Sequence, residues 1–227
     1  MLLREQQWRK RLRITNKRKL PALTKAYGKS TAWEAQEAVV DMDLGRMPHM
    51  HRLNVHRLVQ RHAATYPWHP YTQGHLYLIY GIALVLQGEN AIFWGYSRLC
   101  HTVFPFGPDT PYDKTVLPHY VYNAASQHIT VCRKLFDVTI RMRWLYIMYG
   151  QTFTSQEALC TAWDYLLIDR SHMFRLAAVL LVYAIEMDPF HVPNECGLQR
   201  FDRIVRVTVE CPAVAAKLIA KAQALHV

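Results

Sequence analysis

The stretch that says most about the fold of this chain is VDMDLGRMPHMHRLNVHRLVQRHAATYPWHPYTQG, residues 40–74. An arginine, Arg46, lies near its start, and a glutamine, Gln73, lies at its end. Between them, apolar residues from Leu53 to Tyr66 recur at helical spacing, so one helix would set the distance between the two side chains. A guanidinium can neutralise charge that develops on a phosphate, and a side-chain amide can hold a water. The stretch therefore predicts two polar groups positioned by a helix.

The rest of the chain has the periodicity of an all-α protein. Capping boxes at Thr31-x-x-Glu34 and Thr154-x-x-Glu157 predict two helix starts. Residues 201–210 are compatible with either a strand or a helix. Apolar runs and a favourably placed proline predict further helices over residues 76–86, 89–103, 116–136, 140–149 and 171–187, and from Pro212 onward.

A cluster of helix-breaking residues marks a boundary inside the chain. The sequence PFGPDTPY, residues 105–112, combines three prolines with a glycine, a composition typical of loops. We therefore predict two helical subdomains, residues 31–104 and 105–227, preceded by a basic N-terminal arm over residues 1–30.

The arm carries most of the charge. The 227 residues have a formal net charge of +10, and residues 1–25 supply +8 of it, with nine Lys or Arg residues against Glu5. Such a segment can be a mitochondrial transit peptide, or it can bind anionic lipid or RNA. A solvated, partly helical tail is the third interpretation. The remaining chain is close to neutral.

Cysteine usage and hydropathy indicate a soluble intracellular protein. The cysteines lie far apart without a C-x-x-C pattern, which favours reduced thiols in a helical core. The longest apolar runs, residues 76–86 and 176–185, are too short to span a bilayer. The five cysteines are Cys100, Cys132, Cys160, Cys196 and Cys211.

Three motifs, in order, resemble a known family. Val40-x-x-Asp43-x-x-Arg46-x-Pro48 and Tyr71-x-Gln73-Gly74 resemble the two finger motifs of the TBC family of Rab GTPase-activating proteins. The block from Trp144 to Leu167, with Trp163-Asp164 inside it, resembles the tryptophan-rich region near the end of that domain. The resemblance covers roughly residues 35 to 188 and implies a TBC-like multi-helix fold.

The resemblance also implies roles for individual residues. Arg46 would stabilise the transition state of GTP hydrolysis on a partner, and Gln73 would position the attacking water. Asp43 would orient the guanidinium of Arg46. Gly74 would let the backbone approach the partner closely, and Tyr71 would support the packing. The chain would then activate a Rab-like small GTPase without being a GTPase itself. GTP and Mg²⁺ would belong to that partner, and no cofactor of its own is expected.

The sequence also departs from the family pattern. Met47 stands where threonine is usual after the arginine, and His75-Leu76 stands where Met-Asn usually follows the glycine. The spacer over residues 47–70 is short, and the basic arm replaces the first helices of a typical domain.

These departures keep a second interpretation open, in which the fold is a catalytically silent subunit of a large assembly. The arm would then anchor it to neighbouring subunits, RNA or lipid. The first interpretation places the chain in the cytoplasm or on endomembranes, and the second allows a mitochondrial location.

The sequence predicts neither a metal site nor a phosphate-binding loop. Histidines crowd the same region, and His49-x-His51 could hold a metal, but no carboxylate or thiol lies at ligand spacing to complete the site. We therefore expect scattered core and surface histidines and no metal site. The sequence Gly28-Lys29-Ser30 lacks the upstream glycine of a phosphate-binding loop. The crowded histidines are His49, His51, His56, His62, His69 and His75.

Overall fold

The computed structural model describes residues 2–15, 18–22, 31–47, 49–50, 53–69, 71–103, 121, 144–169, 171–187 and 211–225. Within these ranges the regular structure is helical and contains no strand, so the all-α fold class is confirmed for the described part. The chain divides into two compact units, Met1–Thr102 and Val103–Val227. Most of the helix predicted over residues 116–136, and all of residues 201–210, lie outside the described ranges.

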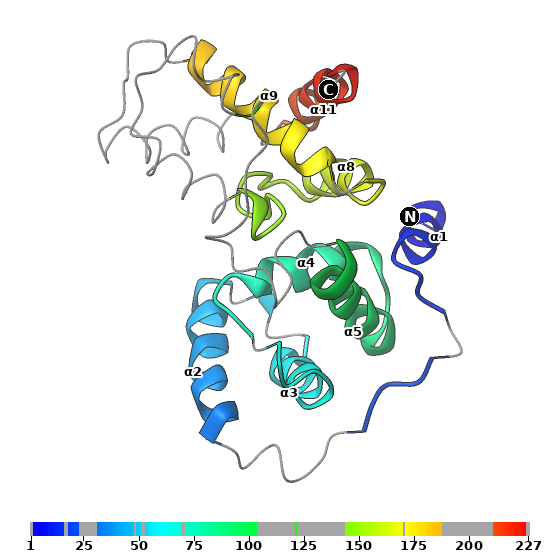
Figure 1. The fold of residues 1–227 in the computed structure, drawn as a ribbon, viewed down its shortest axis with the longest axis vertical. Helices are drawn as coiled ribbons and strands as arrows, with labels where there is room; N and C mark the ends of the chain where they lie inside the picture. Colours follow the sequence, from blue (N-terminus) through cyan, green and yellow to red (C-terminus); the bar gives the residue numbers. More distant parts are fainter. Residues whose placement is uncertain are drawn as a thin grey trace. The chain divides into compact units, whose positions relative to one another are not determined.

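The first unit is built around α4, which is apolar on nearly its whole circumference and is therefore buried. It contacts α1, α2 and α5, while α3 contacts α2 and α5 (Figure 1). A Cβ on Gly95 would lie 2.9 Å from the Leu86 side chain and 3.0 Å from that of Ile82, so glycine permits the close packing of α4 and α5. The described helices of this unit are α1 (Leu2–Arg11), α2 (Thr31–Arg46), α3 (Val55–Thr65), α4 (His75–Val85) and α5 (Glu89–Arg98), followed by the π-helical turn η3 (Leu99–Val103).

Helix α3 forms where the spacer was predicted to be helical, although it is shorter at both ends. Asn54 caps its start, because its side-chain oxygen accepts a hydrogen bond from the Arg57 N–H at 3.1 Å. The helix ends before Pro67, which cannot continue it. Nη1 of the buried Arg61 lies 2.5 Å from Oε1 of Glu89, so an ion pair ties α3 to the start of α5.

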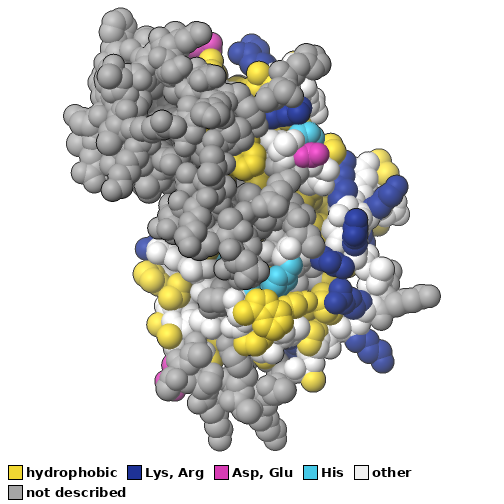
Figure 2. All heavy atoms as spheres, viewed as in Figure 1, with side chains coloured by type: hydrophobic (Ala, Val, Ile, Leu, Met, Phe, Trp, Pro, Cys, Tyr) yellow, Lys and Arg dark blue, Asp and Glu magenta, His cyan; other side chains and the backbone are white. Residues whose placement is uncertain are grey.

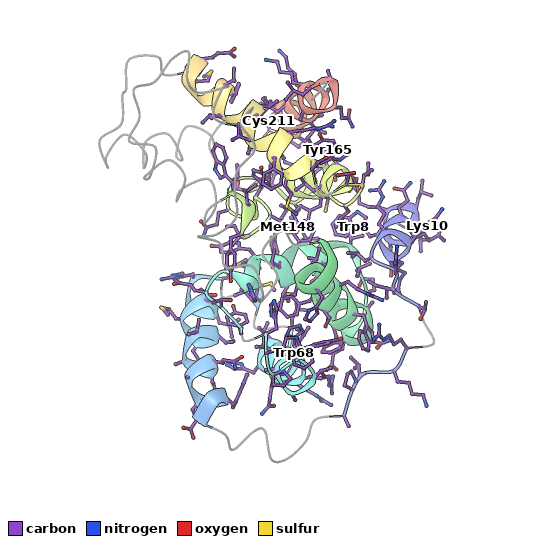
Figure 3. The ribbon with its side chains drawn as sticks, viewed as in Figure 1. Trp8, Lys10, Trp68, Met148, Tyr165 and Cys211 are labelled. Carbon is purple, nitrogen blue, oxygen red and sulfur yellow. The ribbon has the colours of Figure 1, made fainter. Side chains whose placement is uncertain are left out.

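The N-terminal segment is not a solvated tail over residues 2–15, where that interpretation is wrong. Trp8, Leu12 and Ile14 are buried, and α1 contacts α4. The Arg18 guanidinium lies 3.6 Å from the ring centroid of Trp94, in cation–π geometry. Figure 3 shows Trp8 and Lys10 on opposite sides of α1. The arm therefore packs through Trp8, Leu12 and Ile14.

The cations of this segment stay on the outside. Figure 2 shows Lys and Arg side chains gathered on the side where Figure 1 draws α1. The exposed cations among the described residues of the segment are Lys10, Arg13, Arg18 and Lys19.

The second unit contains α8 (Gln156–Leu166), α9 (His172–Met187) and α11 (Pro212–Ala224), and α11 contacts both other helices. Proline occupies the first turn of α11 as predicted. The Trp163 indole N–H donates to the Met148 carbonyl at 2.9 Å, which holds the Trp144–Leu167 block together. The helix predicted over residues 140–149 does not continue to its end, because Met148 and Tyr149 have φ angles of 46° and 60°, values outside the helical region.

Among the described residues, no helix is both long and apolar enough to cross a membrane. Cys100, Cys160 and Cys211 form no disulfide. The first two are buried, as expected for cysteines in a helical core.

The N-cap of α8 is Ser155, one residue later than predicted, and the contribution of this cap to stability can be measured. The hydroxyl of Ser155, not of Thr154, accepts from the Ala158 N–H at 3.1 Å. Because a lost cap leaves a helix donor unsatisfied, Ser155→Ala should lower the free energy of unfolding by about 1 kcal/mol. Thr154→Ala, at an exposed position outside the helix, should change it by less than about 0.5 kcal/mol. Urea unfolding of both variants tests whether Ser155 is the N-cap. Equal losses of unfolding free energy in the two variants would contradict this assignment.

Candidate functional site

The structure brings the two predicted finger side chains into contact. Arg46 is the last residue of α2, and Gln73 lies in the turn before α4. The Gln73 side-chain amide is oriented with its oxygen toward Arg46. In this orientation the oxygen accepts hydrogen bonds from Nη2 of Arg46 at 3.2 Å and from Nη1. Both residues are exposed, and the Arg46 side chain is 52% accessible. Two polar groups from separate motifs therefore share one accessible site.

Asp43 connects the two motifs from below this surface. Its side chain is only 4% exposed, and Oδ1 lies 3.4 Å from Nη1 of Arg46. Oδ2 accepts a 2.8 Å hydrogen bond from the Tyr71 hydroxyl and another of 2.8 Å from the Gly74 N–H. One buried carboxylate thus orients the guanidinium with one oxygen and holds the Gln73 turn with the other.

The turn before α4 depends on glycine and on α2. Gly74 has φ 95° and ψ −14°, a left-handed conformation that costs a side-chain-bearing residue free energy. The Tyr71 N–H donates to the Gln36 side-chain oxygen at 2.9 Å, a second link from this loop to α2. Tyr71 is therefore a positioning residue, as expected, but Gln36 was not identified from the sequence. Its signal would have been a polar residue two turns before Asp43 on the same helix.

The two departures from the family pattern point into the protein. Met47 is buried, and its N–H continues the end of α2 by donating to the Asp43 carbonyl at 3.1 Å. His75 is buried on α4, with Nδ1 2.8 Å from the Tyr96 hydroxyl and Nε2 3.3 Å from the Thr72 hydroxyl. Neither residue replaces a group on the exposed surface beside Arg46. Both support the elements that carry the site.

Behind the Gln73 turn lies a cluster of histidine rings. The His62 ring centroid is 5.4 Å from that of His69 and 5.7 Å from that of His101. The His69 and His75 rings stack at 5.8 Å. The grouping was not expected from the sequence, because α3, the following loop, α4 and η3 each contribute one ring. The scattered-histidine expectation is therefore wrong for His62, His69 and His75, and it did not include His101.

Burial keeps the rings of His62 and His75 neutral. Loss of hydration, followed by repulsion from the neighbouring His69, lowers the pKa of His75 to about 3. The same desolvation, followed by repulsion from His69, His101 and His75, holds the pKa of His62 well below its ordinary value. At neutral pH the imidazoles of His62 and His75 are therefore uncharged.

Comparison with known proteins adds no assignment: no protein-family model, no curated protein and no solved structure matches the chain. The interpretation of the site therefore depends on its geometry.

The role of Asp43 can be tested with an isosteric change. In Asp43→Asn the amide oxygen can still accept from Tyr71 and Gly74, but the NH₂ group then faces the Arg46 guanidinium, donor against donor. We expect the free energy of unfolding to fall by about 1.5–3 kcal/mol, the contribution of hydrogen bonds to a charged group. Asp41→Asn is the matched control on α2, since Asp41 is 63% exposed. Urea unfolding should show a change below about 0.5 kcal/mol for that control, and similar losses in both variants would contradict the assignment.

The histidine cluster predicts acid sensitivity. Because the pKa of His75 in the folded chain is about 3, below the ordinary 6.5, the unfolded chain binds more protons as pH falls through this window. The free energy of unfolding should therefore be highest above pH 6.5. Between pH 6.5 and pH 3 it should fall by about 1.4 kcal/mol per pH unit for each such histidine. His75→Gln should reduce that slope by one proton, measured by urea unfolding in metal-free buffer. An unchanged slope in His75→Gln would refute the prediction.

Proposed function

We propose that this chain is a GTPase-activating protein of the TBC type, which lends Arg46 and Gln73 to GTP hydrolysis on a Rab-like small GTPase. The observation that carries the proposal is the contact between these two exposed side chains, which come from different motifs and share one buried anchor, Asp43. The resemblance of the motifs to the TBC fingers supplies the reaction. GTP and Mg²⁺ enter with the partner, and the chain acts in the cytoplasm or on endomembranes.

The chemistry needs what these two side chains offer. Phosphoryl transfer develops charge on the transferred group, and an arginine supplied by a partner protein accelerates hydrolysis by about 10³- to 10⁵-fold. Arg46 has five N–H donors, and its contacts with Gln73 and Asp43 use only some of them. Because the Gln73 oxygen faces Arg46, its NH₂ group points away from the guanidinium, where it would donate to the attacking water of a bound partner.

The short spacer is compatible with this role. Helix α3 spans most of the spacer. Its cap at Asn54 and its ion pair through Arg61 fix the two ends of the helix. The side chains of Arg46 and Gln73 are in contact despite the short spacer. A catalytic pair tolerates displacements of well under about 1 Å. The anchors on Asp43 supply that constraint, because they bind the end of α2 to the start of α4.

The second candidate is a catalytically silent structural subunit of a large, possibly mitochondrial, assembly. It is favoured by the N-terminal segment, where Leu2 and Leu3 are 78% and 68% exposed beside exposed cations. An apolar and basic helix face of this kind suits a neighbouring subunit, RNA or an anionic lipid surface. In this case Arg46 and Gln73 would only satisfy each other's hydrogen bonds.

Single-turnover GTP hydrolysis by a panel of Rab-like GTPases tests the proposal. Wild-type chain should accelerate at least one member, and Arg46→Ala should remove about 10³- to 10⁵-fold of that acceleration. Gln73→Ala should cost about 10²-fold through misplacement of the water. The matched control is Arg57→Ala, because the Arg57 side chain is 53% exposed and lies 3.7 Å from Glu89, away from the finger pair.

The outcomes separate the two candidates. If the Arg46 and Arg57 variants lose the same fraction of the GTPase acceleration, the effect is due to surface charge, and the catalytic role of Arg46 is refuted. A folded wild-type chain that accelerates no GTPase in the panel would favour the structural subunit.

A further inference from the structure

Three potential metal ligands converge inside the first unit. Ring nitrogens of His62 and His69 and the sulfur of Cys100 all lie within 4.8 Å of one another, and all three residues are buried. His62 comes from α3, His69 from the loop that follows it, and Cys100 from η3. Cys100 is thus the thiol that the sequence spacing did not reveal, since a π-helical turn distant in sequence supplies it.

The cluster contains buried polar atoms that have no hydrogen-bond partner among the described residues. Nε2 of His62 makes no hydrogen bond to any described residue, although the side chain is only 1% exposed. Nε2 of the adjacent His101 also has no partner among the described residues. Buried nitrogens of this kind are rare because desolvation without a hydrogen bond is unfavourable. A metal ion would accept their lone pairs and remove this cost.

We propose that His62, His69 and Cys100 bind one Zn²⁺ ion, with His101 beside them to complete a tetrahedral site. Imidazole nitrogen and thiolate sulfur are the ligand atoms that bind Zn²⁺ in most protein sites. Mg²⁺ and Ca²⁺ require oxygen ligands, and the cluster of His62, His69 and Cys100 offers none. This inference is independent of the proposed GTPase-activating function.

The distances require a small closure on binding. Zinc–nitrogen bonds of about 2.0–2.1 Å and zinc–sulfur bonds of about 2.3 Å place tetrahedral ligand atoms roughly 3.5 Å apart. The ligand atoms would therefore approach one another by about 1 Å relative to the 4.8 Å limit.

Protonation states are compatible with uptake at neutral pH. The low pKa of His62 leaves its imidazole neutral, as a metal ligand requires. Burial raises the pKa of the Cys100 thiol to about 12, so the thiol keeps its proton without metal. Zn²⁺ would form a bond to sulfur while the S–H bond breaks, and the proton would leave to solvent. Metal binding should therefore release a proton and weaken as pH falls.

Such an ion would be structural. It would join α3, the loop over residues 66–69 and η3, and the His69 ring already stacks on His75, the first residue of α4. Zinc would thus stabilise the loop that leads into Tyr71-x-Gln73-Gly74. Its coordination shell would be closed by protein groups, as in other structural zinc sites.

Metal titration of the full-length chain tests this. After chelator treatment, wild type should bind one Zn²⁺ per chain and show a concentration-dependent rise in its unfolding midpoint. Co²⁺ in the same site should give a thiolate-to-metal charge-transfer band. Cys100→Ser and His62→Gln should each weaken binding by about 100-fold or more, and Cys100→Ser should abolish the band. Cys160→Ser and His56→Gln are matched controls and should bind as wild type does.

Wild-type chain alone can overturn the proposal, so the test survives a variant that fails to fold. Folded wild type that binds no Co²⁺, or binds it without the thiolate band, would exclude a site at Cys100. Survival of the band in Cys100→Ser, or its loss only in Cys160→Ser, would place the metal elsewhere.

Discussion

The buried carboxylate of Asp43 is the constraint on which the first unit depends. A carboxylate removed from water is strongly unfavourable unless hydrogen bonds and an opposite charge compensate it. Asp43 obtains this compensation from the Tyr71 hydroxyl, the Gly74 N–H and the Arg46 guanidinium. Two of these partners lie beyond α3 in the sequence, so the charge is satisfied only when the chain has returned to α2. The fold and the site are therefore stabilised by the same contacts.

This anchor explains why several neighbouring residues are arranged as they are. The left-handed Gly74 aims its N–H at Asp43 while starting α4, and Gln36 holds the backbone of Tyr71 one step earlier. His75 then fixes the first turn of α4 against Tyr96. Each contact limits the freedom of the turn that carries Gln73. Arg46 meets Gln73 because the turn is held from three directions, although neither side chain is itself buried.

Periodicity predicted the helices well because apolar spacing reports directly on burial, as α4 and α9 illustrate. It failed where the outcome depends on one hydrogen bond or on distant chain segments. Thr154 and Ser155 are both competent caps, and only the backbone path selects Ser155. The charge of the N-terminal segment concealed the burial of Trp8. Arg46 and Gln73 could be named from their motifs, but the histidine cluster could not, because Cys100 and His101 reach it through a π-helical turn.

The Asp43 anchor alone does not distinguish a catalytic surface from a structural one. A silent fold would need Asp43, Tyr71 and Gly74 in the same places, since they satisfy a buried charge. It would not need an exposed glutamine in contact with an exposed arginine, because neither side chain closes the core. Exposed hydrogen bonds contribute little to stability, so the fold gains almost nothing from this pair. The Arg46–Gln73 contact, with its accessible donors, is therefore the feature that favours chemistry on a partner.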